Sequence, residues 1–90
     1  MLKITSTKTF KKDYVKVAKR GKDISKINHV INLLEHELPL DSRYRDHKLS
    51  GKYFGCRDCH IEPDWLLIYK IFKQELILER TGSHSDLFKK

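Results

Sequence analysis

Hydrophobic residues at the start of the chain recur first at the spacing of a strand and then at the spacing of a helix. Leu2 and Ile4 alternate with polar residues and indicate a short first strand. Ser6 or Thr7 can cap the helix that follows, and Gly21 is a natural stop. The apolar face of this helix consists of Phe10, Tyr14, Val17 and Ala18. Its polar face carries the basic residues Lys11, Lys12, Lys16, Lys19 and Arg20.

A second helical pattern follows directly. Asp23 is a typical N-cap, and the helix is expected to end before Pro39, which disfavours helical backbone at Leu38. The apolar face of this helix consists of Ile24, Ile27, Val30, Ile31 and Leu34. Because only a short turn containing Gly21 separates the two patterns, together they predict a helical hairpin.

The second half of the chain changes to an extended pattern. Residues 39–54 are polar and have no period, so we expect a charged loop there. Strands are predicted at 55–61, 65–72 and 75–80, and the nearly continuous apolar run of 65–72 is typical of a central strand. The turns between the predicted strands are Glu62-Pro63-Asp64 and Lys73-Gln74.

The order of these elements is a strand, two helices and three further strands. Such an order predicts an α+β fold in which an antiparallel sheet of about four strands packs against the N-terminal helical hairpin. The length of 90 residues suits one small domain, which we expect to span residues 1–90.

The charge of the chain is positive and unevenly distributed. The net charge is +7, and residues 1–45 hold 11 basic and 5 acidic side chains, whereas residues 46–90 hold 8 and 7. A basic half favours a polyanionic partner, although many small domains are basic without one. No apolar run approaches the roughly 20 residues of a membrane span, and no secretory pattern is visible. We therefore expect a cytoplasmic protein with reduced cysteines and no membrane partner.

The stretch CRDCH at residues 56–60 matches the C-x-x-C-H pattern of c-type haem attachment. No export signal is visible, however, and the only methionine is the first residue. A structural zinc site would need a second ligand pair, which the spacing does not provide. Strand periodicity places Cys56, Asp58 and His60 on one face and Arg57, Cys59 and Ile61 on the other. We therefore expect no haem, no metal and no other cofactor.

Three histidines lie in polar segments at the ends of the predicted elements. His60 closes one strand, and the turn at Pro63 brings Asp64 back toward it. His47 lies in the charged loop, and His84 follows the last strand. Imidazole beside a carboxylate is suited to proton transfer, because its pKa lies near neutral pH. The alternative is that His60 is an ordinary strand-end residue and that Asp64 only stabilises the turn.

Three stretches in a fixed order carry a family resemblance: RDHKLSGKY (45–53), RDCHIEPDWLLIYK (57–70) and ERTGSHSDLF (79–88). The segment PLDSRYRDH (39–47) and the lysine-rich first helix also fit. In this order the motifs resemble the RelE superfamily of bacterial toxins, and within it the YafQ branch of messenger-RNA endonucleases. The resemblance implies a microbial-ribonuclease-like fold, ribosome-dependent cleavage of messenger RNA at the decoding site, and inhibition by a cognate antitoxin.

The resemblance also implies which residues act. The family's catalytic positions fall on His47, His60, Asp64 and His84, and its closing aromatic residue falls on Phe88. We expect His60 with Asp64 on the base side, His84 as the acid and His47 in a supporting role, in a metal-free attack by the 2′-hydroxyl. The expected substrate-binding residues are Lys52, Arg57, Arg80 and Phe88.

The basic face of the first helix is an ordinary solvated face by default. If the chain docks on the ribosome, its cations are expected to contact ribosomal RNA phosphates. The antitoxin is expected to be acidic in the segment that contacts the toxin. Two other functions remain open: a ribosome-independent ribonuclease on the same fold, and a non-catalytic RNA-binding regulator, which would not need the histidine set.

Overall fold

The computed structural model describes residues 1–88 of the chain. Five strands form one sheet in the order β1-β5-β4-β3-β2. The strands are β1 (Lys3–Ser6), β2 (His47–Lys48), β3 (Arg57–Glu62), β4 (Trp65–Phe72) and β5 (Glu75–Gly82). The helices are α1 (Lys8–Lys19), α2 (Ile24–Glu35) and α3 (His84–Phe88), with short 3-10 helices η1 (Ser42–Tyr44) and η2 (Gly51–Tyr53).

Local capping starts both long helices where the sequence predicts it. The Thr7 hydroxyl accepts a hydrogen bond from the Phe10 amide at 2.9 Å, and the Asp23 carboxylate accepts one from the Ser25 amide at 3.0 Å. The apolar face of α1 differs from the prediction, because Ala18 is exposed and Asp13 is buried. A long-range partner explains the difference, as described for the site below.

The antiparallel part of the sheet confirms the predicted hairpins. β4 pairs antiparallel with β3 and with β5, and it covers the predicted residues 65–72. Lys73 and Gln74 have φ values of 48° and 67°, the left-handed backbone that two-residue hairpin turns favour. The predicted loop at 39–54 also contains structure, because β2 adds a two-residue strand to the edge of β3.

The first strand corrects the prediction of a purely antiparallel sheet. β1 pairs parallel with β5, so the sheet is mixed. Amide hydrogen bonds from Lys3 to the Gln74 carbonyl at 3.0 Å and from Thr7 to the Leu78 carbonyl at 3.1 Å continue this pairing. The alternation of apolar residues at Leu2 and Ile4 indicates a strand, but it contains no information on the partner or its direction.

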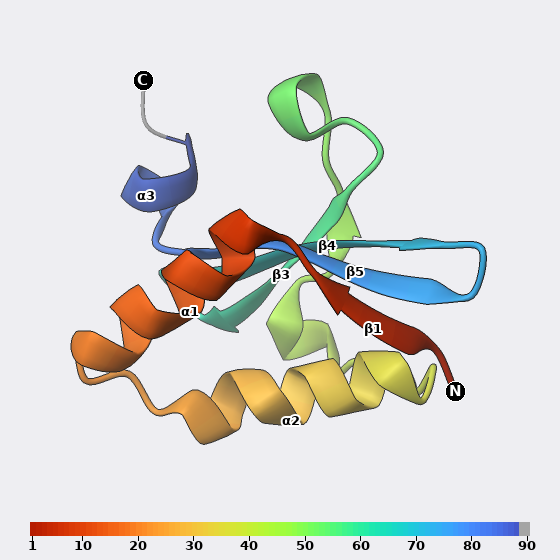
Figure 1. Cartoon of the computed structure of the whole chain (residues 1–90), viewed down its shortest axis with the longest axis horizontal. Coiled ribbons are helices and arrows are strands. Elements are labelled where there is room, and N and C mark those ends of the chain that lie inside the picture. Colours follow the sequence, from red (N-terminus) through yellow and green to blue (C-terminus); the bar gives the residue numbers. More distant parts are fainter. Residues whose placement is uncertain (89–90) are drawn as a thin grey trace.

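The two faces of the sheet carry separate apolar clusters. α1 and α2 cover one face, and α3 together with the segment before β3 covers part of the other (Figure 1). Cys59 is fully buried in the helix-side cluster, whereas Cys56 belongs to the opposite cluster with Leu66, Ile68 and Leu87. The two cysteines therefore lie on opposite faces, as strand periodicity predicted. Within residues 1–88, no helix has the length and apolar character needed to cross a membrane.

Candidate active site

The three histidines predicted from the sequence form a row on the α3 side of the sheet. The ring centroids of His47 and His60 are 6.4 Å apart, and those of His60 and His84 are 5.6 Å apart. Sheet register produces this arrangement, because β2 places His47 opposite Asp58, two residues before His60 on β3. His84 joins from the first residue of α3. Segments far apart in the chain thus deliver three imidazoles to one place.

Asp64 pairs with His84, which corrects the predicted pairing of Asp64 with His60. Its Oδ1 accepts hydrogen bonds from the His84 amide at 2.9 Å and lies 2.6 Å from the His84 ring Nδ1. Strand register explains the partner: Leu66 is opposite Gly82, so the same register continued by two residues places Asp64 opposite His84. These hydrogen bonds, first from the amide and then from the ring, lower the pKa of the Asp64 carboxyl.

Asp58 is a site residue to which sequence reasoning gave no role. Its Oδ1 lies 3.2 Å from His47 Nδ1, and the residue is 4% exposed. Burial raises the pKa of its carboxyl, and the neighbouring charges of His47, His60 and His84 act in the opposite direction. The alternation of β3, which places Asp58 on the His60 face, was the available signal. A carboxylate buried beside three imidazoles is uncommon outside functional sites.

Among the described residues, two polar atoms at the centre of this row have no hydrogen-bond partner, although Asp58 Oδ1 is in ion-pair contact with His47. Asp58 Oδ1 and His60 Nδ1 are buried and make no hydrogen bond to any of the residues that the structure describes. Leaving such an atom unsatisfied costs about 1–3 kcal/mol, so native proteins keep few of them. Their position between the histidines leaves two polar atoms at the centre of the row available to a ligand or to water.

Aromatic rings extend the row beyond His84. Phe88 lies 6.5 Å from the His84 ring and meets Tyr53 edge-on at 5.6 Å. Lys52 Nζ lies 5.4 Å from the Tyr53 ring centroid, and Arg80 Nη1 lies 3.4 Å from the Tyr53 hydroxyl. Of the predicted substrate-binding residues, Lys52, Arg80 and Phe88 therefore gather at this end of the row.

Both predicted arginines of the site are held by carboxylates. Arg80 donates to Asp13 from Nε at 2.6 Å and from Nη2 at 3.0 Å, which explains why Asp13 is buried on α1. Arg57 donates to Asp46 from Nε and Nη2, each at 3.2 Å. Arg57 also lies on the helix side of β3, where the Tyr69 hydroxyl shares Asp46 at 2.6 Å. The structure therefore does not bring Arg57 to the histidines.

The predicted docking cations lie along α1, but they differ in their surroundings. Lys11, Lys12 and Lys19 are exposed. Arg20 instead donates to Asp86 of α3, from Nη1 to Oδ2 at 2.6 Å and from Nη2 to Oδ1 at 3.2 Å. Lys16 Nζ lies 3.8 Å from Asp86 Oδ1. The C-terminal end of α1 is thus tied to the helix that carries His84.

The fold is that of a small RelE-superfamily toxin. Residues 2–89 match the family described as bacterial toxin of type II toxin–antitoxin system, YafQ. The chain belongs to this family, as its three ordered motifs predicted.

Known proteins of similar sequence and fold agree with this assignment. The chain is 46% identical over 80 residues to the mRNA interferase toxin YafQ of Escherichia coli strain K12, which covers 88% of this chain and 87% of that protein. The toxin fold in the Escherichia coli DinJ–YafQ complex matches with a TM-score of 0.89 at 43% identity, over 98% of this chain and 99% of that one. A copper-bound mutant toxin from Helicobacter pylori matches with a TM-score of 0.92 at 48% identity, over 98% and 100% of the two chains.

Proposed function

We propose that this toxin is an endoribonuclease that cleaves messenger RNA on the ribosome and so inhibits translation. The proposal is supported by the similarity to an mRNA interferase toxin and, above all, by the row of His47, His60 and His84 with Asp64 bound to one end. A binding module needs no such set of proton-transfer groups. The relative solved with DinJ supports a protein antitoxin as the inhibitory partner, which we expect to be acidic where it contacts the toxin.

The chemistry requires a base for the 2′-hydroxyl, an acid for the leaving 5′-oxygen and positive charge near the phosphate. Asp64 is hydrogen-bonded to Nδ1 of His84. A carboxylate there stabilises the protonated ring and leaves Nε2 to deliver the proton, which supports His84 as the acid. On the base side, His47 Nδ1 lies 2.7 Å from the Arg45 carbonyl oxygen. Because a carbonyl only accepts, that nitrogen carries the hydrogen, and Nε2 of the neutral ring is free to take a proton. We assign the base role to His60, whose ring lies beside both other histidines, and a supporting role to the free Nε2 of His47.

The remaining groups bind the substrate. Arg80 and Lys52 neutralise the charge that develops on the phosphate, and Phe88 orients a base beside His84. No step of this scheme uses a metal ion. The expected products are a 2′,3′-cyclic phosphate or 3′-phosphate and a 5′-hydroxyl.

Replacement of the histidines tests the site. His60→Ala and His84→Ala are each expected to abolish growth arrest on induction and to slow message cleavage by about 10²- to 10⁴-fold. The matched control is His36→Ala, because His36 is exposed at the end of α2 and its side-chain contacts are local, to the Asn32 carbonyl at 2.9 Å and to Glu35 at 4.0 Å. Mapping RNA 5′ ends relative to codons is the measurement. If both variants still arrest growth and cleave message, the site is wrong.

The same variants assign the acid and the base. A message with sulfur in place of the bridging 5′-oxygen has a leaving group that needs no proton. Such a substrate is expected to restore cleavage by His84→Ala and not by His60→Ala. If cleavage is restored for His60→Ala and not for His84→Ala, then His60 is the acid and His84 the base.

Two other functions are distinguished by simple measurements. A ribosome-independent ribonuclease would cleave purified RNA at the same rate with and without ribosomes. A non-catalytic regulator would bind RNA and leave it intact, and its histidine variants would behave like the wild-type protein.

A further inference from the structure

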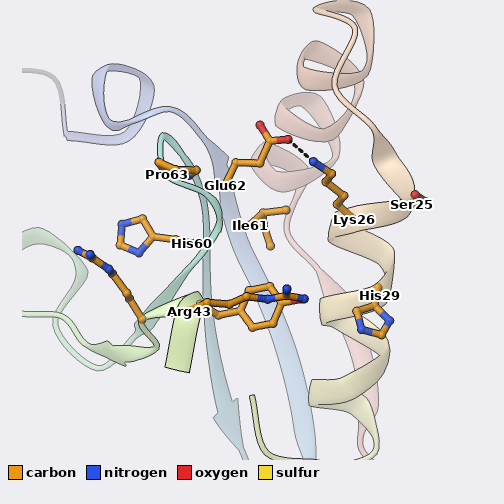
Figure 2. A pocket seen from close by; sticks show the side chains of 10 residues that line it. Ser25, Lys26, His29, Arg43, His60, Ile61, Glu62 and Pro63 are labelled. Atoms are coloured by element: carbon orange, nitrogen blue, oxygen red, sulfur yellow. Dashed lines mark hydrogen bonds and ion pairs between the residues drawn. The ribbon is translucent and has the colours of Figure 1, made fainter. Parts of the chain in front are cut away.

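A groove leads from His60 along the edge of β3 to α2. It encloses about 830 Å³, within the range of about 300–1,000 Å³ that is common for ligand sites. His60 lies on one side of it and His29 of α2 on the other, with Arg43 between them (Figure 2). The groove therefore begins at the centre of the histidine row and extends away from α3.

The short edge strand leaves this groove open. β2 pairs only with Arg57 and Asp58 in the described part of the chain, so the edge of β3 from His60 to Glu62 is not covered by a strand. An uncovered strand edge presents main-chain N–H and C=O groups. A ligand in the groove thus meets hydrogen-bonding backbone as well as side chains.

The charge of the groove is positive. Glu62, the one carboxylate among the described residues that line it, is paired with Lys22 at 3.0 Å and with Lys26 at 2.8 Å. Arg43 and Arg45 are exposed and have no such partner, since the arginine ion pairs within residues 1–88 belong to Arg20, Arg57 and Arg80. Two guanidinium groups are therefore available to an anionic ligand.

The two arginines present different surfaces. The Arg43 guanidinium lies 4.9 Å from the Tyr44 ring centroid, and its Nη2 donates to the Tyr44 hydroxyl at 3.0 Å. These contacts hold the guanidinium at the groove, and a planar guanidinium can stack on a nucleic-acid base. Arg45 joins the groove to the histidine row, because its main-chain oxygen is bonded to His47. Replacing the Arg45 side chain leaves that main-chain contact in place.

We propose that this groove binds a nucleotide next to the scissile phosphate of single-stranded RNA. Arg43 stacks on the base, and Arg45 contacts a backbone phosphate. The inference rests on the proposed function, because it takes His60 as the point where the groove meets the cleaved bond. An acidic protein segment would suit the charge, but it needs neither a planar stacking surface nor continuity with His60.

Binding of an uncleavable oligonucleotide tests the groove. An eight-nucleotide RNA with 2′-deoxy residues at the cleavable positions is titrated by fluorescence anisotropy over a range of salt concentrations. Arg43→Glu/Arg45→Glu is expected to weaken binding at least tenfold and to reduce the slope of log K against log salt by about 0.7 for each lost phosphate contact. Arg43→Lys keeps the charge and removes the stacking plane, so it weakens binding with little change in that slope. The control is Lys3→Glu/Lys73→Glu, an equal charge change on exposed residues outside the groove.

Each outcome decides one proposal. The groove proposal is refuted if both double variants lose oligonucleotide affinity equally. It is also refuted if Arg43→Glu/Arg45→Glu binds the oligonucleotide as tightly as the wild-type protein. If Arg43→Glu/Arg45→Glu loses binding to a glutamate-rich peptide but still binds RNA, the groove is a site for a protein ligand and the proposal is refuted. Failure of the wild-type protein to cleave ribosome-bound message, with oligonucleotide binding lost only in the groove variant, refutes the proposed function and keeps the groove. If Arg43→Glu/Arg45→Glu cleaves ribosome-bound message with the wild-type KM, the groove proposal is refuted and the proposed function stands.

Discussion

At the scale of single residues, Asp58 shows how one buried carboxylate sets the character of the site. It has almost no exposure, one of its oxygens lacks a hydrogen-bond partner within residues 1–88, and burial raises the pKa of its carboxyl. A charge in that position destabilises the folded state unless the adjacent imidazoles are protonated. We infer that Asp58 positions the histidines and balances their charge, because its carboxylate lies 3.2 Å from His47 in the same row.

Asp58→Asn keeps the shape of the side chain and removes its charge. At pH 7 the variant is expected to unfold at a higher temperature than the wild-type protein and to cleave more slowly. Because the pKa of Asp58 is raised in the folded state, its ionised carboxylate lowers the free energy of unfolding at pH values above that pKa. This cost disappears below the unfolded-state pKa of about 3.9, where the carboxyl is protonated in both states. Calorimetry from neutral to acidic pH should therefore show the two Tm values converging in acid. A lower Tm for the variant at pH 7 contradicts this account.

At the scale of elements, α3 depends on its attachments. Five residues are too few for a helix to be stable alone. Asp86 accepts two hydrogen bonds from Arg20 and one from the Ser83 amide at 2.9 Å, and Leu87 is buried beneath the helix. A Cβ at Gly82 would lie 2.8 Å from an Asp86 oxygen, so glycine makes room for this contact. α1 thus orients the helix that presents His84.

Arg20→Ala should therefore impair catalysis through α3. We expect a lower kcat with little change in KM, whereas Lys8→Ala, which removes an exposed charge at the other end of the same helix, should leave kcat unchanged. The hydrogen bonds from Arg20 hold the pKa of Asp86 well below its usual range. The stabilisation is present above the unfolded pKa of about 3.9 and is lost as pH falls through the lower folded value. The Tm difference between wild type and Arg20→Ala should shrink accordingly in acid. Equal effects of the two variants would show that Arg20 acts only as a surface charge.

At the scale of the whole molecule, the positive charge is divided between two surfaces. Lys11, Lys12 and Lys19 are exposed on α1, whose C-terminal end adjoins α3. Arg43 and Arg45 lie in the groove beside His60. A toxin that holds message in the groove would leave the lysines of α1 free for ribosomal RNA.

Charge reversal on α1 tests this division of labour. Lys11→Glu/Lys12→Glu is expected to weaken ribosome binding at least tenfold and to reduce its salt dependence, with oligonucleotide binding unchanged. Lys3→Glu/Lys73→Glu serves as the equal-charge control. Sedimentation with ribosomes over a salt series is the measurement, and equal loss in the two variants would mean that only net charge matters.

The sequence by itself determined the features that depend on local energetics. Caps at Thr7 and Asp23, the buried run of β4 and the opposite faces of Cys56 and Cys59 follow from periodicity and short-range hydrogen bonds. Motif order also identified the three histidines, because the residue types needed for proton transfer are visible without coordinates.

Only the tertiary structure decided which of these groups meet. The parallel pairing of β1, the bond between Asp64 and His84, the burial of Asp13 by Arg80 and the open edge beside His60 all join segments far apart in the chain. Such contacts depend on strand register and partner choice, which a local pattern does not encode. Strand periodicity had already placed Arg57 on the face opposite Asp58, but its partner Asp46 is fixed by the fold. Asp58 likewise gained a role only when β2 and α3 brought their histidines to it.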